Sequence, residues 1–162
     1  MAGGTPAIVA LDAARVVYSV HEFDNEIAPG ELGYGKAAAA ALGVDEARVF
    51  KTLLVTLHGS STPHAVGIVP VSTQLSLKGI AHALDAKKAE MLDRRDAERL
   101  TGYVVGGISP FGQRKALPTV IDASCLGHST IFVSGGKRGL DIEITPNDLI
   151  TVLEAVTGAI GS

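Results

Sequence analysis

The stretch FKTLLVTLHGSSTPHAVGIVPV, residues 50–71, determines the central part of the expected fold. It contains two apolar runs, residues 50–57 and 65–71, that are rich in valine, leucine and isoleucine. Glycine, serine, threonine and proline fill the connection at residues 59–63, and these residues are typical of turns. Two such runs joined by a short turn predict an antiparallel β-hairpin.

Outward from this hairpin, the chain alternates helix and strand signals without a regular pattern. Capping residues predict helices that start at Thr5-Pro6, Ser76, Asp93 and Thr145-Pro146, and an alanine-rich helix over residues 36–42. Further strands are expected at residues 16–23, 119–121, 130–133 and 140–144. Because this order is not a repeated βαβ unit, we predict a mixed-sheet α/β domain of the α+β type. No linker is visible, so residues 1–162 are expected to form one domain.

The composition is that of a globular protein in a reducing compartment. Apolar residues make up 46% of the chain and charged residues 19%, which excludes bulk disorder. Cys125 is the single cysteine, so neither an intrachain disulfide nor a multi-cysteine zinc site can form. The longest stretch of low charge is broken by histidine, glycine and proline, so no membrane span is expected. The N-terminus lacks the basic residues of a secretory signal, and we expect a cytoplasmic protein.

Charge is unevenly distributed along the chain. The net charge is −3, but residues 47–139 hold 12 basic and 6 acidic residues and the two flanking segments are acidic. Lys and Arg are common on any solvated face, yet a locally basic segment also suits a phosphate-bearing partner.

Common nucleotide and metal motifs do not fit. The string GYGKAA at residues 33–38 has the glycine spacing of a dinucleotide-binding motif, but the residues before it predict a loop and not the strand that the motif requires. GISPFG at residues 107–112 lacks the Lys-Ser/Thr pair of a phosphate-binding P-loop. The five histidines show no metal-ligand spacing, and no activating partner lies close to Cys125 in sequence. We therefore expect no cofactor and no metal.

Three segments are unusual for a purely structural role, although each also has a structural interpretation. Lys51 begins an apolar strand, where it could extend into solvent or project into a cleft. The glycine-dense loop at residues 102–112 would let backbone N–H groups approach a ligand oxygen. The turn at residues 134–139 adds two cations, Lys137 and Arg138, to further glycines.

Four strings, taken in order, resemble the YbaK/EbsC family of aminoacyl-tRNA deacylases, which are related to the editing domain of bacterial prolyl-tRNA synthetases. They are FKTLLV (50–55), TGYVVGGISP (101–110), LPTVID (117–122) and VSGGKRGLDIE (133–143). The resemblance extends over most of the chain and is closest to the branch that acts on Cys-tRNA(Pro). It implies a mixed β-sheet curled into an open barrel and flanked by helices.

The resemblance also implies the site and its partners. The substrate is a mischarged proline tRNA, bound by its 3′ end, and prolyl-tRNA synthetase is a transient partner. Phe23 stands where some relatives have tyrosine, so a hydroxyl contribution is not available there. The implied catalytic residues are Lys51, Gly106, Gly107, Ser109 and Asp141. The implied substrate-binding residues are Phe23, Lys51, Ile108, Pro110, Ser134, Gly135, Lys137 and Arg138.

In this branch the substrate thiol attacks its own ester, and backbone N–H groups of the loop stabilise the oxyanion. Lys51 is expected to hold the terminal adenosine phosphate or ribose. Two alternatives stay open: a deacylase for another aminoacyl-tRNA such as Ala-tRNA(Pro), and a non-catalytic module that binds tRNA or a synthetase.

Overall fold

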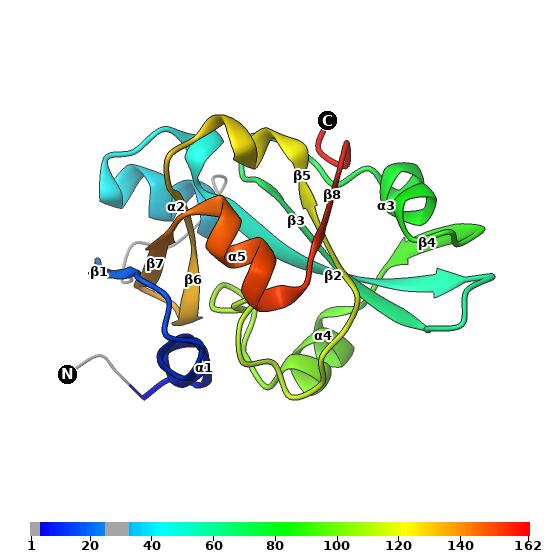
Figure 1. Cartoon of the computed structure of the whole chain (residues 1–162), viewed down its shortest axis with the longest axis horizontal. Coiled ribbons are helices and arrows are strands. Elements are labelled where there is room, and N and C mark those ends of the chain that lie inside the picture. The colour runs from blue at the N-terminus through cyan, green and yellow to red at the C-terminus, as the bar shows by residue number, and fades with distance from the viewer. Residues whose placement is uncertain (1–3, 25–32) are drawn as a thin grey trace.

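The computed structural model describes residues 4–24 and 33–162. Figure 1 shows the chain as helices packed around two β-sheets. In chain order the elements are α1 (Pro6–Ala14), β1 (Ser19–Glu22), α2 (Gly33–Leu42), the 3-10 helix η1 (Glu46–Arg48), β2 (Phe50–His58), β3 (His64–Pro70), α3 (Leu77–Ala83), β4 (Lys88–Met91), α4 (Arg94–Thr101), β5 (Thr119–Asp122), the 3-10 helix η2 (Ala123–Gly127), β6 (Ile131–Lys137), β7 (Leu140–Ile144), α5 (Pro146–Leu153) and β8 (Val156–Gly158).

The helix starts predicted from capping residues are confirmed. The Thr5 hydroxyl accepts the Ile8 N–H, and Pro6 occupies the first turn of α1. Ser76, Asp93 and Thr145 cap α3, α4 and α5 in the same way. Each cap satisfies a backbone donor that has no partner within the helix, and this local bond can be read from the sequence.

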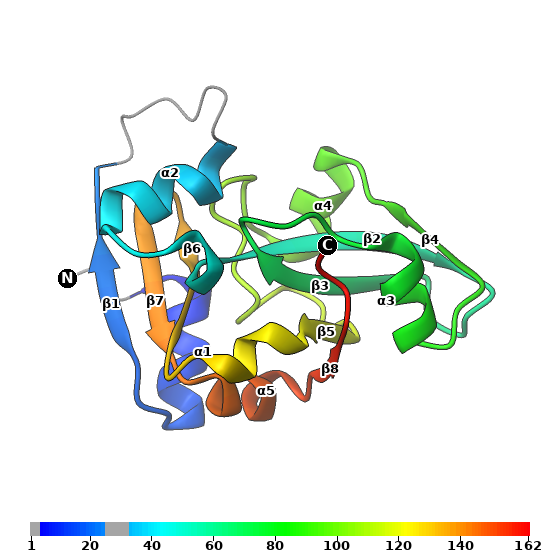
Figure 2. The ribbon, with the colours of Figure 1, turned by 90° about the horizontal axis from the view of Figure 1, so that it is seen from above.

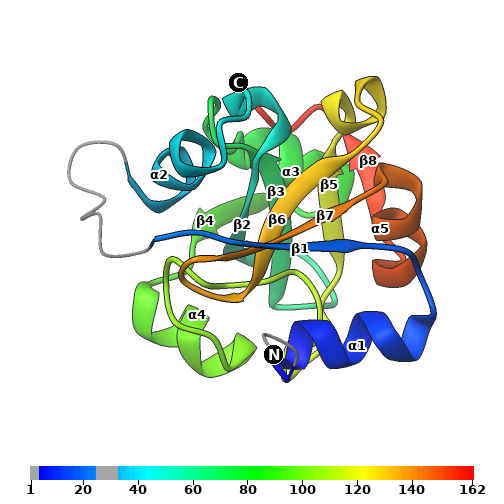
Figure 3. The ribbon, with the colours of Figure 1, turned by 90° about the vertical axis from the view of Figure 1, so that its left-hand side faces the viewer.

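The strands form two sheets rather than one curled sheet. Within the described residues, β1-β7-β6 form an antiparallel sheet, and β4-β2-β3-β5-β8 form a mixed sheet with parallel β3–β5 and β5–β8 pairs. Among these residues, a single bridge between Val49 and Phe132 links the two sheets, and Figure 3 shows their strands crossing. The mixed α/β class is therefore confirmed, but the expected barrel is not found, because strand pairing does not continue around from one sheet to the other.

Two strands and one helix end differ from the sequence-based expectation. β4 and β8 were not predicted, and α2 starts at Gly33 instead of residue 36. α5 ends at Leu153. Glu154 adopts the left-handed conformation with φ +50° and stops the helix. Cys125 lies in η2.

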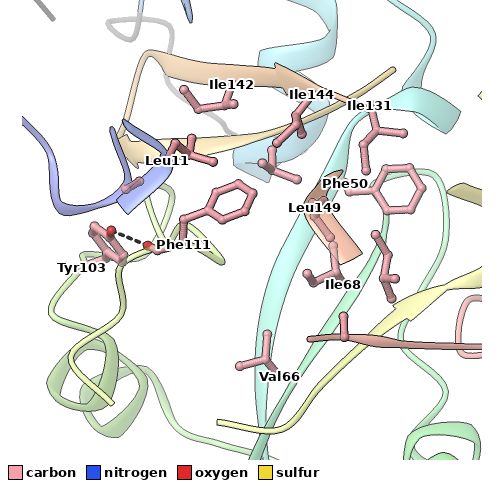
Figure 4. Packing of buried hydrophobic residues seen from close by; sticks show 14 of the residues in the cluster. Leu11, Phe50, Val66, Ile68, Tyr103, Phe111, Ile131, Ile142, Ile144 and Leu149 are labelled. Carbon is pink, nitrogen blue, oxygen red and sulfur yellow. Dashed lines mark hydrogen bonds between the residues drawn. The ribbon is translucent and has the colours of Figure 1, made fainter. Parts of the chain in front are cut away.

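The main core lies between the two sheets and reaches the glycine-dense loop. Phe50 and Ile68 from one sheet and Ile142 from the other belong to the same buried cluster. Figure 4 shows the Tyr103 hydroxyl donating to the Phe111 carbonyl, at 2.6 Å. The loop is thus anchored in the core near both ends, which leaves residues 104–108 between two fixed points.

Figure 2 shows the sheet β1-β7-β6 with α2 on one side and α1 on the other. Val133 and Ile142 pack with Leu11 of α1, whereas Phe132 packs with Ala39 of α2. Alternate residues along β6 and β7 therefore face two different environments. This alternation decides which side chains of these strands belong to the core and which face the site described next.

Candidate functional site

A cavity of about 410 Å³ lies where the two sheets, α2, α4 and the glycine-dense loop meet. Its walls are largely apolar, with residues such as Val49, Leu54 and Ala97. The structure brings these predicted site residues together in its lining: Phe23, Lys51, Gly106, Ile108, Ser134, Arg138 and Asp141.

Lys51 reaches the cavity because β2 has an open edge there. β4 pairs with β2 only over Val55–His58, and the final contact is the Leu92 N–H donating to the Leu54 carbonyl at 3.0 Å. Beyond that point, this edge of β2 has no neighbouring strand among the described residues, and its residues 50–54 line the cavity. Burial lowers the pKa of Lys51, and the nearby positive charge of Lys36 lowers it further. Lys51 forms no ion pair with any residue in the described part of the chain.

Asp141 supplies a buried carboxyl to the same cavity. It lies in β7 opposite Ser134 of β6 and is only 6% exposed. Burial raises the pKa of the Asp141 carboxyl to about 7, and no other cause contributes. Within residues 4–24 and 33–162, no hydrogen bond reaches this carboxyl. A ligand that donates to it would satisfy a group that is otherwise costly to bury.

Thr52 is a cavity residue to which the sequence analysis assigned no role. Its hydroxyl oxygen is buried and has no hydrogen-bond partner among the described residues. It follows Lys51 on the strand that carries the site, and this adjacency is the signal that sequence could have offered. Tyr34 also lines the cavity and was not assigned to a site.

The glycine-dense loop approaches the cavity through Gly106. Gly106 has φ +91°, and a Cβ atom there would lie 2.8 Å from both the Arg138 Nε and the Tyr34 ring. Only glycine fits this conformation and this spacing. The Gly107 N–H donates to the Val104 carbonyl at 2.9 Å, so Gly107 contributes to the turn rather than offering a free donor.

Five predicted site residues do not line the cavity: Gly107, Ser109, Pro110, Gly135 and Lys137. The Ser109 hydroxyl accepts the Phe111 N–H within the loop. The Gly135 carbonyl accepts the Thr5 hydroxyl at 2.7 Å, which ties β6 to α1. Lys137 is exposed, and a Cβ atom at Gly107 would lie 2.7 Å from its Cα. These residues shape the loop and the sheet around the cavity.

Neither a metal cluster nor a membrane-spanning helix is present in the described segments. No group of three or more His, Cys, Asp or Glu residues is placed to hold a metal ion there. No helix in those segments is long and apolar enough to cross a bilayer. Cys125 is buried away from the cavity, and burial raises the pKa of its thiol to about 11.

The fold and the cavity together define an α/β domain with a mostly apolar pocket that carries a lysine and a buried carboxyl. Such a pocket suits a small ligand that has both a cationic amine and anionic or polar oxygens. Residues 34–152 match the aminoacyl-tRNA editing domain family. This chain therefore belongs to that family, and the resemblance seen in the sequence is confirmed.

One curated relative comes from Enterococcus faecalis and is named "Putative Cys-tRNA(Pro)/Cys-tRNA(Cys) deacylase EbsC". It is 39% identical over 117 residues, which are 72% of this chain and 70% of the relative.

Two solved structures share the fold. One, described as "a putative trans-editing enzyme for prolyl tRNA synthetase", has a TM-score of 0.82 at 21% identity and covers 97% of this chain and 95% of its own. The other, described as "hypothetical protein APE2540", has a TM-score of 0.83 at 20% identity and covers 97% of this chain and 99% of its own. The family assignment gives this chain a role in aminoacyl-tRNA editing.

Proposed function

We propose that this chain removes cysteine from mischarged Cys-tRNA(Pro). The observation that carries the proposal is the cavity that contains both the Lys51 ammonium and the Asp141 carboxyl, neither of which has a side-chain partner among residues 4–24 and 33–162. The name of the Enterococcus faecalis relative, which includes Cys-tRNA(Pro), supports this substrate. The description of one structural neighbour as a trans-editing enzyme supports action on a tRNA already released from its synthetase.

In the proposed complex the aminoacyl end enters the apolar part of the cavity. Its α-ammonium donates to the Asp141 carboxylate, which otherwise lacks a partner in the described residues. Lys51 lies at the open edge of β2 and holds the phosphate or ribose of the terminal adenosine. Opposite charges on the two protein groups thus match opposite ends of the same substrate.

The reaction is substrate-assisted. The cysteine sulfur attacks its own ester carbonyl, so a C–S bond forms while the C–O bond to the ribose breaks. The thiol proton ends on the released ribose oxygen, and the products are free tRNA and a cysteine thiolactone that water then opens. Intramolecular attack supplies the proximity that a separate protein nucleophile would otherwise provide.

The protein stabilises the oxyanion that forms during this attack. The Gly106 N–H is the candidate donor, because Gly106 lines the cavity and the Gly107 N–H is already bonded to Val104. Loss of one such donor typically raises the barrier by about 2.7–4 kcal/mol.

Cations around the cavity form the proposed tRNA-facing surface. Arg94 and Arg138 line the cavity. The neighbouring exposed cations are Arg95, Arg114, Lys115 and Lys137. Lys87 and Lys88 contribute less, because they lie at the start of β4, away from the cavity that Met91 lines, and because Lys88 pairs with Glu90 at 3.0 Å. A surface with so few contacts binds tRNA weakly, and a transient complex with prolyl-tRNA synthetase in the cytoplasm would supply the remaining affinity.

The test is release of labelled amino acid from Cys-tRNA(Pro), Ala-tRNA(Pro) and Pro-tRNA(Pro). The variants are Lys51→Ala and, as a matched control, Lys78→Ala, an exposed lysine on α3. Loss of cysteine alone, abolished by Lys51→Ala and unchanged by Lys78→Ala, is the expected result. Release of alanine instead assigns the chain to another editing branch. No release from any substrate, with tRNA still bound, identifies a non-catalytic module.

A further inference from the structure

Both backbone polar groups of Val105 are held by side chains from other elements. The Val105 N–H donates to the Glu98 carboxylate of α4 at 2.8 Å. The Val105 carbonyl accepts from the Arg138 Nε, which comes from the turn between β6 and β7, at 2.9 Å. A backbone residue in a glycine-dense loop is thereby clamped between two parts of the fold that are 40 residues apart in sequence.

This clamp acts on the central peptide of a turn. The Gly107 N–H closes the turn on the Val104 carbonyl, and Gly106 in its third position has φ +91°, as a type II turn requires. Type I and type II turns differ mainly by a flip of their central peptide, which here joins Val105 to Gly106. The bond from Arg138 to the Val105 carbonyl selects one of these two orientations.

The orientation matters because the next donor lines the cavity. In a planar trans peptide the Gly106 N–H points opposite to the Val105 carbonyl, and therefore away from Arg138. No residue in the described part of the chain accepts a hydrogen bond from this N–H. A flipped peptide would remove that donor and present a carbonyl oxygen in its place.

The two clamping side chains are themselves held. The Arg138 guanidinium lies 4.6 Å from the centre of the Tyr34 ring, and both residues line the cavity. The Glu98 carboxylate forms an ion pair with Arg94, with 3.5 Å between Glu98 Oε2 and Arg94 Nε. The Val105 N–H is the main cause that lowers the pKa of Glu98, so this carboxylate stays ionised as the acceptor at neutral pH.

We propose that Glu98 and Arg138 are positioning residues that fix the Val105–Gly106 peptide, so that the Gly106 N–H is presented as the oxyanion donor. This inference rests on the proposed deacylase function. It assigns to Glu98 a role in kcat through the loop, without contact to the substrate.

The experiment compares Glu98→Ala and Glu98→Gln, with Asp96→Ala as the control. Gln retains an oxygen that can accept the Val105 N–H, whereas Ala does not. Asp96 lies on the same helix and pairs with Arg99 at 3.0 Å, outside the loop.

Deacylation is measured on whichever aminoacyl-tRNA the wild-type protein cleaves fastest. We expect Glu98→Ala to lower kcat about 10- to 100-fold with KM within about 3-fold, since the donor is misplaced rather than absent. We expect Glu98→Gln to recover most of kcat, and Asp96→Ala to match wild type.

A second readout does not depend on activity. In ¹H–¹⁵N NMR spectra, the Gly106 amide should shift or broaden in Glu98→Ala and return toward its wild-type position in Glu98→Gln. A wild-type kcat and an unchanged Gly106 resonance in Glu98→Ala overturn the proposal. If the wild-type protein cleaves no aminoacyl-tRNA, the deacylase function fails, while the NMR comparison still decides whether Glu98 holds the loop.

Discussion

Asp141 lies directly opposite His21 in the β1–β7 ladder, yet the His21 imidazole is bonded to Glu143, two residues further along β7, at 2.9 Å. Glu143 also contacts Thr130 and lies 3.5 Å from Arg48. The carboxylate at the more exposed position therefore collects the partners, and the buried Asp141 has none in the described residues. The Asp141 carboxyl is therefore buried at a cost to folding stability.

Asp141→Asn should make the protein less sensitive to pH. The pKa of Asp141 is raised to about 7 in the folded state from an ordinary value of 3.8, so the folded state binds its proton more tightly than the unfolded state. Stability therefore falls as pH rises from about 4 to 7, and asparagine removes that loss. Between pH 5 and pH 8 the variant should gain about 2–3 kcal/mol relative to wild type in urea unfolding. If the unfolding free energies of the two proteins changed in parallel with pH, the raised pKa of Asp141 would be contradicted.

Gly106→Ala should abolish deacylation while the protein still folds. The added methyl group meets Arg138 and the Tyr34 ring at 2.8 Å, and alanine disfavours the positive φ of this position. We expect kcat to fall at least about 100-fold, as for the loss of an oxyanion donor. Gly127→Ala is the control, because a Cβ atom there meets nothing within 4 Å. Equal activity of the two variants in the release assay would show that the turn tolerates a side chain.

Cys125→Ala should leave deacylation unchanged. Cys125 is fully buried, burial raises its pKa to about 11, and it packs in the main core away from the cavity. Removing the sulfur should cost about 0.5–1.5 kcal/mol of unfolding free energy, the range for loss of one buried group. A folded Cys125→Ala protein without activity would contradict the substrate-assisted mechanism.

Lys36→Met should raise the pKa of Lys51. The positive charge of Lys36 helps to lower this pKa, so removing that charge stabilises the Lys51 ammonium. The alkaline decline of kcat/KM, which follows deprotonation of a required cation, should then move to higher pH. Lys78→Met, on the exposed face of α3, controls for net charge. An alkaline limb that stays in place in Lys36→Met would remove Lys51 from the ionisations that limit activity.

Arg95→Ala combined with Lys115→Ala should weaken tRNA binding and reduce its salt dependence. Both residues are exposed and lie in the proposed tRNA-facing surface. Each lost phosphate contact lowers the slope of log K against log salt concentration by about 1. Filter binding between 50 and 200 mM salt, roughly the range over which such contacts are screened, measures this slope. Lys87→Ala combined with Lys88→Ala should change it less, and the opposite ranking would move the interface to the far end of β4.

The sequence by itself determined the elements that local bonds define, and the family. Thr5, Ser76, Asp93 and Thr145 each cap a helix through a bond to a backbone group three residues away, so their effect is visible without the fold. The hairpin of β2 and β3 follows from two apolar runs and one turn. The ordered motifs identified the editing family, and three residues that they assigned to the site, Lys51, Gly106 and Asp141, line one cavity in the structure.

The tertiary structure decided the features that depend on distant partners. β4 and β8 are short strands that exist because β2 and β5 offer edges to them, and pairing between elements far apart in sequence has no local signal. For the same reason the described strands of the two sheets meet at one bridge and do not close into a barrel. Ser109 and Gly135 likewise form hydrogen bonds within the scaffold and do not line the cavity.

The tertiary structure also decided the chemical properties of the site. The pKa of Asp141 is raised by burial, which exists only in the folded chain. The hydrogen bonds of Glu98 and Arg138 with the Val105 backbone likewise form only when distant parts of the chain pack together.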